Sequence, residues 1–195
     1  MRRLLDLGLE QIRKLLEEMG REALASLGYA KLSLDGEFND AEEVAAKLKL
    51  IREEILDIAT ELLVRYSPVA SDLRFIQSAI DVSYDLYRIS RYAMEIERTM
   101  KILGELRSEI VKEAFELTME AVKTAIEAFS SLDEVASGRI LEIDNKVDEL
   151  YISSLRRIKE CHPGEALILR HLERICDHAK EIGGKVIYVK EGKRV

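Results

Sequence analysis

The sequence has no tryptophan, only two prolines and ten glycines in 195 residues, and no long apolar run. The scarcity of proline and glycine excludes collagen-like and low-complexity chains. A content of 47% hydrophobic and 34% charged residues is typical of a helix-rich globular protein. No apolar stretch reaches the roughly 18 residues that a membrane-spanning helix requires. We therefore predict a folded helical protein that does not span a membrane.

Cysteine is also scarce, and acidic residues outnumber basic ones, 37 to 30. The two cysteines, Cys161 and Cys176, lack the Cys-x-x-Cys spacing of zinc and redox sites, so we predict two buried, reduced thiols. Reduced thiols are typical of the cytoplasm, which is the location we predict. The net charge of −7 argues against a nucleic-acid partner, because proteins that bind nucleic acid usually present a basic surface.

Apolar residues recur at spacings of three and four along nearly the whole chain, and no segment keeps a period of two for long. This pattern predicts an all-α fold. Asp40 with Glu43 forms a capping box, and Pro68 and Pro163 each stand where the first residue of a helix belongs. The predicted helices cover six ranges: 2–28, 40–66, 68–103, 105–131, 133–161 and 164–190.

The chain also repeats itself. When "LYRISRYAMEI" (86–96) is set over "LERICDHAKEI" (172–182), Leu, Arg, Ile, Ala, Glu and Ile coincide, and each segment lies in a helix that follows a proline. The simplest architecture is two tandem three-helix bundles, residues 1–103 and 104–195, related by an internal duplication. A chance match of short helical segments is the alternative, because Leu, Ile, Ala and Glu are common in helices.

Two pairs of acidic residues, one helical turn apart, lie in the last two predicted helices: Asp144 with Asp148, and Glu173 with Asp177. A helical wheel places the first pair at the edge of the apolar stripe and the second pair off it, so we expect all four outside the core. If these helices pack antiparallel, the carboxylates converge on one groove, and such oxygen clusters bind hard or borderline cations. We predict a metal site there. The alternative is a solvated helix face, since the chain has 37 acidic residues.

The remaining motifs point away from catalysis. His178 offers one imidazole beside Asp177, but no Glu-x-x-His occurs in the sequence, which argues against a ferritin-like di-iron oxidase. No nucleophile motif and no phosphate-binding glycine loop is present. We therefore predict that the protein is not an enzyme.

The stretch "LERICDHAKEIGGKVIYVKEGK" (172–193) closely resembles the C-terminal signature of the PhoU family. The segment "YSPVASDLRFIQSAIDVSYDLYRIS" (66–90) is similar to the family segment that leads into the first copy of that signature. "DNKVDELY" (144–151) resembles a third family stretch. The resemblance covers most of the chain, in the family's order and with its duplication.

This resemblance implies two three-helix bundles side by side in a cytoplasmic protein that restrains phosphate uptake and phosphate signalling. It implies as partners the ATPase subunit of a phosphate transporter, or a phosphate permease, and a phosphate-responsive sensor kinase, with the protein itself a homodimer. Some family members bind iron or zinc clusters through Glu/Asp-x-x-x-Asp motifs. In this sequence, the matching residues are Asp144, Asp148, Glu173 and Asp177.

The first repeat departs from the family pattern. Tyr87 and Arg91 stand where the signature has Glu and Asp, and Glu53 and Asp57 have the right spacing but lie out of register. We therefore expect any metal site in the second repeat alone. In that repeat, Cys176 replaces the usual glycine.

Three functions compete at this stage. The leading one is a non-catalytic regulator of phosphate uptake that binds protein partners and a metal cluster. The alternative is a carboxylate-bridged iron-handling or hydrolytic metalloprotein on a helical bundle. The third is a helical dimerisation module without a ligand.

Overall fold

The structure, a computed structural model, describes residues 2–160 and 162–193. Within these ranges its regular secondary structure is helical, without any strand, which confirms the predicted fold class. A short 3-10 turn, η1 (Ser33–Asp35), follows the first helix. The six α-helices are α1 (Arg2–Leu32), α2 (Ala41–Tyr66), α3 (Ala70–Leu103), α4 (Glu109–Ser131), α5 (Ala136–Arg156) and α6 (Pro163–Glu191).

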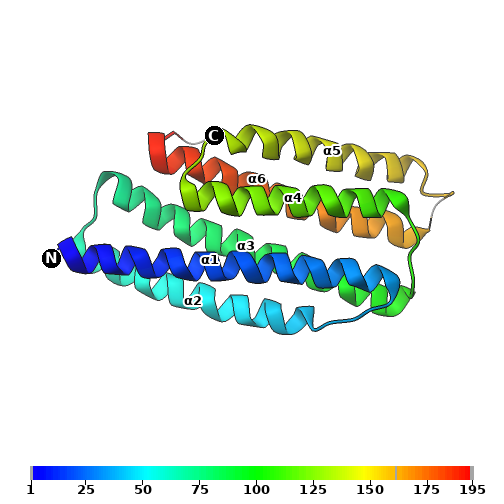
Figure 1. Ribbon diagram of the computed structural model, residues 1–195, viewed down its shortest axis with the longest axis horizontal. Helices are drawn as coiled ribbons and strands as arrows, with labels where there is room; N and C mark the ends of the chain where they lie inside the picture. The colour runs from blue at the N-terminus through cyan, green and yellow to red at the C-terminus, as the bar shows by residue number, and fades with distance from the viewer. Residues whose placement is uncertain (1, 161, 194–195) are drawn as a thin grey trace.

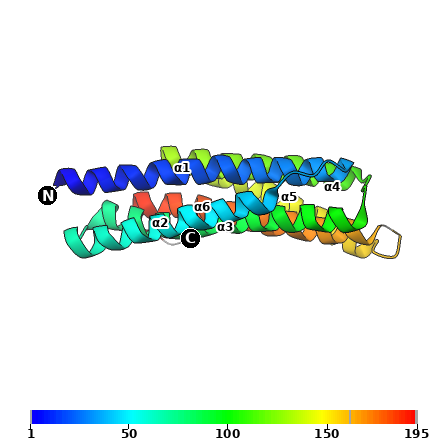
Figure 2. The same ribbon diagram turned by 90° about the horizontal axis from the view of Figure 1, so that it is seen from below.

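The helices form two three-helix units, α1–α3 and α4–α6, which lie side by side along their length (Figure 1). Within each unit every helix packs against the other two, and between the units α3 packs against α6 and α1 against α4. Figure 2 shows α1 and α4 lying together over α2, α3 and α6. One continuous hydrophobic core runs through both units, because apolar residues from all six helices are buried in contact with one another.

Local sequence features explain most of the helix ends. The Asp40 side chain accepts a hydrogen bond from the Glu43 backbone N–H at 3.2 Å, which confirms that Asp40 caps α2. Pro163 is the first residue of α6, as predicted. The corresponding prediction for Pro68 is wrong. The backbone is left-handed at Ser67 (φ 46°) and again at Ala70 (φ 50°), so α3 begins only at Ala70.

Other boundaries also differ from the sequence prediction. The fourth helix begins at Glu109 instead of residue 105, and the fifth begins at Ala136 instead of residue 133. The fifth helix ends at Arg156 and gives way to turns over residues 157–160, several residues earlier than expected. The first helix continues to Leu32, where η1 carries the chain to Gly36, whose φ of 82° ends the turn. Cys176 is a buried free thiol, as predicted, while the prediction for Cys161 lies outside the described residues. Over the described part of the chain, no helix is long and apolar enough to cross a membrane.

Candidate functional site

The four carboxylates predicted as a metal site do gather where α5 packs against α6. Asp144 and Asp148 come from α5, and Glu173 and Asp177 come from α6. Partial burial raises the pKa of Asp148, and so do the negative charges of the other three carboxylates. The four groups therefore lie within electrostatic reach of one another, although they are far apart along the chain.

The expectation that all four lie outside the core is wrong for two of them. Asp144 is 2% exposed and Glu173 is 6% exposed. A helical wheel records only the face of the residue's own helix, and it misses side chains from neighbouring turns and helices that cover a carboxylate. In this protein each of the two buried carboxylates is paired with a basic side chain.

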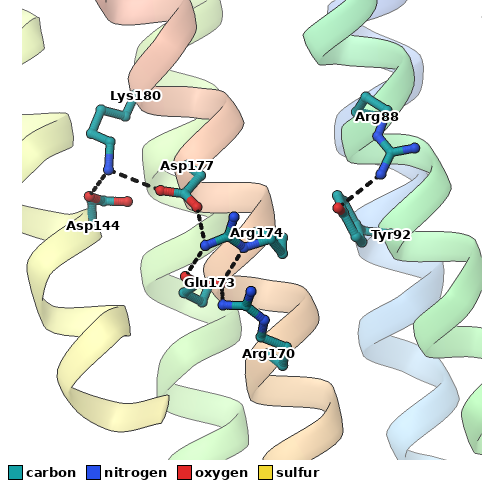
Figure 3. Close-up of polar contacts among 8 residues, drawn as sticks. All are labelled: Arg88, Tyr92, Asp144, Arg170, Glu173, Arg174, Asp177 and Lys180. Carbon is teal, nitrogen blue, oxygen red and sulfur yellow. Dashed lines mark hydrogen bonds and ion pairs between the residues drawn. The ribbon is translucent and has the colours of Figure 1, made fainter. Parts of the chain in front are cut away.

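Arginine side chains on α6 hold Glu173. Arg170 Nη1 donates to Glu173 Oε2 at 2.7 Å, and Arg174 Nε donates to the same oxygen at 2.6 Å (Figure 3). Arg174 also contacts Glu173 Oε1 through Nη2, and that same nitrogen lies 2.6 Å from Asp177 Oδ2. One guanidinium thus bridges the two carboxylates that stand one turn apart, which offsets their mutual repulsion.

Lys180 makes the link between the two helices. Its Nζ lies 2.5 Å from Asp144 Oδ2 on α5 and 3.0 Å from Asp177 Oδ1 on α6 (Figure 3). Burial alone would lower the pKa of Lys180, but the hydrogen bonds to Asp144 and Asp177 outweigh it and hold that pKa above its usual range. Lys180 is therefore positively charged where it lies between α5 and α6.

Carboxylate oxygens are suited to a hard cation, but in this structure three of the four carboxylates are paired with basic side chains. No group of three His, Cys, Asp or Glu residues in the described ranges is placed to hold a metal ion. However, Asp144 Oδ1 is buried without a hydrogen-bond partner, and no basic group pairs directly with Asp148 in residues 2–160 or 162–193. These free oxygens fit the chemistry of a divalent ion, provided that Lys180 moves aside.

The first repeat has no comparable carboxylate set at the matching positions. Tyr87 and Arg91 align with Glu173 and Asp177. The residue that aligns with Lys180 is Met94, and it packs on Ala41 and Ala45 of α2 instead of pairing with an acid.

Other first-repeat side chains also differ in their partners. Arg88 aligns with Arg174, but it donates to the Tyr92 hydroxyl at 2.9 Å rather than to a carboxylate (Figure 3). Glu53 and Asp57 lie exposed on α2, and Glu53 Oε1 is 4.0 Å from Lys49 Nζ. An exposed pair at this distance adds little stability and shows no preformed site.

His178 lies apart from the four carboxylates. Its Nδ1 is 2.9 Å from Asp85 Oδ1 on α3, at the contact between the two units. Asp85 is buried, and burial raises the pKa of its carboxyl group, although the hydrogen bond to His178 opposes this effect. The imidazole thus serves the α3–α6 contact, and this arrangement gives no support to His178 as an additional metal ligand.

Cys176 lies in the core beneath the carboxylates. Its thiol contacts Thr118 Oγ1 of α4 at 3.4 Å. Burial, reinforced by the nearby negative charges of Asp144, Asp177 and Asp148, raises the pKa of this thiol to about 12. The thiol is therefore protonated at neutral pH and is not a thiolate ligand in this state.

A groove of about 430 Å³ lies between α3 and α6, closer to the C-terminal end of α6 than the carboxylates. Lys185 pairs with Asp81 across it at 2.7 Å, and the Tyr188 hydroxyl donates to Gln77 Oε1 at 2.8 Å. These polar groups satisfy one another and join the two units, so the carboxylates between α5 and α6 remain the stronger candidate site.

Comparison with known proteins agrees with this architecture. A family model described as "PhoU domain" matches residues 16–100 and 111–186, one segment in each unit. A phosphate-specific transport system accessory protein PhoU homolog from Archaeoglobus fulgidus is 34% identical over 140 residues, which cover 70% of this chain and 67% of the relative. PhoU homolog 1 of that system from Thermotoga maritima is 29% identical over 196 residues, covering 93% and 83% of the two chains. The crystal structure of PhoU from Pseudomonas aeruginosa matches with a TM-score of 0.76 at 27% identity, covering 96% of this chain and 99% of that one.

Proposed function

The chain belongs to the PhoU family, and from this premise we propose that it is an accessory protein that regulates phosphate transport. The observation that carries the proposal is the family match in both units of one continuous helical fold. The described side chains offer paired acids, a buried protonated thiol and a packed core. The relatives are named accessory proteins, which supports a role in regulation rather than in catalysis.

The proposed partners are the ATPase subunit of a phosphate transporter, or a phosphate permease, and a phosphate-responsive sensor kinase. The protein would act in the cytoplasm as a homodimer and restrain phosphate uptake when phosphate is plentiful. The names of the relatives, which place them in a phosphate-specific transport system, support this assignment.

The proposal also includes a metal site in the second unit. Asp144, Asp148, Glu173 and Asp177 would hold the ion or cluster, with iron and zinc as the candidates. Support comes from the gathering of four carboxylates and from the buried Asp144 oxygen without a partner. A bound cation would supply positive charge to these carboxylates and tie α5 to α6.

An association experiment tests the regulatory role. The untagged protein is mixed with the purified ATPase subunit of the phosphate transporter from its own organism, and binding is measured by analytical ultracentrifugation and by calorimetry. The ATPase subunit of an unrelated transporter serves as the control. We expect saturable binding to the phosphate transporter subunit or, in a parallel measurement, to the sensor kinase. Absence of binding to the transporter subunit, the permease and the kinase would contradict the proposal.

A pair of double variants tests the metal site. Glu173→Gln with Asp177→Asn removes two negative charges but keeps oxygen acceptors for Arg174 and Lys180, so the metal-free fold should persist. Because a ligand that binds only the folded state raises its stability, the wild type should melt at a higher temperature with added zinc or manganese, and the double variant should not.

The matched control changes the same residue types in the first unit. Glu53→Gln with Asp57→Asn removes an exposed acidic pair from α2 and should leave the metal response of the wild type intact. If the second-unit double variant still gains as much thermal stability from metal as the wild type does, the four carboxylates are not the site.

A further inference from the structure

We propose that Lys180 is a built-in counter-ion that competes with metal for the carboxylates between α5 and α6. Metal binding would then be an exchange, in which the lysine side chain leaves as the metal ion arrives. This inference rests on the metal site of the proposed function and adds to it the residue that sets its affinity.

The position of the Lys180 ammonium group carries the argument. Its Nζ lies 2.5 Å from an oxygen of Asp144 and 3.0 Å from an oxygen of Asp177, so it bridges one carboxylate from each helix. An ammonium ion is a compact, full positive charge. It therefore occupies the place that a bridging cation between α5 and α6 would need, and the two cannot share these oxygens.

The local charge balance favours such an exchange. Four ionised carboxylates carry four negative charges. The basic side chains supply three positive charges, from Arg170, Arg174 and Lys180. One negative charge is therefore left uncompensated. Asp144 Oδ1 also remains buried without a partner in this arrangement. A divalent ion in place of the ammonium group would neutralise the remaining charge, and it offers more coordination positions than three N–H donors.

The side chain of Lys180 can also reach solvent. It is 37% exposed, whereas the Asp144 side chain that it contacts is 3% exposed. The flexible four-carbon stem can therefore turn the ammonium group into solvent while the carboxylate stays in place. Metal binding would thereby place a new positive charge on the surface of α6.

The internal duplication provides a natural comparison. At the position that aligns with Lys180, the first unit has Met94, which packs on Ala41 and Ala45. The unit without the carboxylates thus has a neutral side chain, and the unit with the carboxylates has a cation. This correlation within one chain supports a role for Lys180 that is specific to the acidic site.

The experiment compares the wild type with Lys180→Met, which installs the first-unit residue, and with Lys14→Met as a control. Lys14 lies exposed on α1 and makes only a loose contact of 3.9 Å with Glu10. Proteins are purified without a tag, stripped with a chelator, and studied by thermal melting and by equilibrium dialysis against manganese or zinc chloride at about 20 °C.

The proposal predicts opposite effects on the two readouts. Without metal, Lys180→Met should melt about 5–10 °C below the wild type, because it leaves buried Asp144 without its ion-pair partner. With metal, it should bind at least about tenfold more tightly than the wild type, because the competing cation is gone. Lys14→Met should match the wild type in both measurements. Lys180→Gln, which keeps a hydrogen-bond donor but no charge, should also bind metal more tightly and provides the test if the methionine variant does not fold.

The outcomes separate this inference from the proposed function. If the wild type and the Lys180 variants bind metal with equal affinity, the site stands and the competition is overturned. If neither the wild type nor the variants bind metal, the carboxylate site of the proposed function fails, and the competition fails with it. A variant that binds more weakly than the wild type would show that Lys180 supports the metal, which also overturns the proposal.

Discussion

At the scale of single residues, the buried charges at the contacts between helices have specific partners. Asp85 of α3 is 6% exposed, and its carboxylate lies 2.9 Å from His178 Nδ1 of α6. Burial favours the neutral form of a carboxyl group and thus raises the pKa of Asp85, although the His178 contact lowers it in part. An acid whose pKa is raised by folding weakens the fold as it ionises.

The first prediction follows from this raised pKa. The pKa of Asp85 is higher in the folded than in the unfolded protein, so its stabilising contribution is present at acid pH and is lost as the pH rises through the folded pKa. Asp85→Asn cannot ionise and keeps an oxygen that accepts a hydrogen bond from His178. Its free energy of unfolding, relative to that of the wild type, should therefore be greater at about pH 8 than at about pH 4.

Urea unfolding at a series of pH values measures this difference. Asp57→Asn, which alters an exposed carboxyl group on α2, is the control and should show a smaller dependence on pH. If the free energy of unfolding of Asp85→Asn falls relative to that of the wild type as the pH rises, the assignment of a burial-raised pKa to Asp85 is contradicted.

The candidate site shows how far sequence reasoning reaches at this scale. The i, i+4 spacing and the antiparallel packing of two helices were enough to predict that four carboxylates meet. The wheel did not predict that Asp144 and Glu173 are buried, because a wheel of one helix does not include the side chains of neighbouring helices. The i, i+3 spacing of Arg174 to Asp177, and of Asp177 to Lys180, was the available signal for these pairs.

At the scale of the helices, periodicity predicted six elements close to their observed positions. Apolar spacing identifies a helix reliably because one continuous face must be buried over many turns. The ends are less certain, since they depend on a few local torsions. Pro68 shows this, because left-handed Ser67 and Ala70 displace the start of α3 by two residues, and nothing in the spacing indicates that displacement.

Two glycines of α1 provide a prediction at the scale of the helices. A Cβ added at Gly28 would meet no atom within 4 Å, whereas a Cβ added at Gly20 would lie 2.8 Å from Ile126 Cγ2 of α4. Gly28→Ala should therefore raise the free energy of unfolding by about 0.5–1 kcal/mol through helix propensity alone. Gly20→Leu should lower it by about 1–3 kcal/mol by forcing α1 and α4 apart.

Chemical denaturation of both variants provides the measurement, with the wild type as reference. The two glycines lie about two turns apart on one helix, so a general preference of α1 for or against side chains would move both variants in the same direction. A stabilising effect of Gly20→Leu would show that α1 and α4 do not pack as closely as the structure places them.

At the scale of the whole molecule, the two units are joined by a shared core and differ in their chemistry. Phe75 of α3 stacks on Phe129 of α4 with ring centroids 6.1 Å apart, and the Arg13 guanidinium of α1 lies 4.0 Å from the Phe75 ring centroid. The duplication was visible in the sequence, but this junction was not, because residues from three helices meet there. Two units of the same fold thus carry different side chains at matching positions, a lysine-bridged set of carboxylates in one and Tyr87, Arg88 and Arg91 in the other.

The central proposal, that this chain restrains phosphate transport, is tested most directly by phosphate uptake in the organism that carries it. The initial rate of radiolabelled phosphate uptake is compared, in phosphate-rich medium, between the wild type, a strain that lacks the chain, and that strain with the chain restored. The account predicts faster uptake without the chain and a return to the wild-type rate on restoration. Equal uptake rates in all three strains would contradict it.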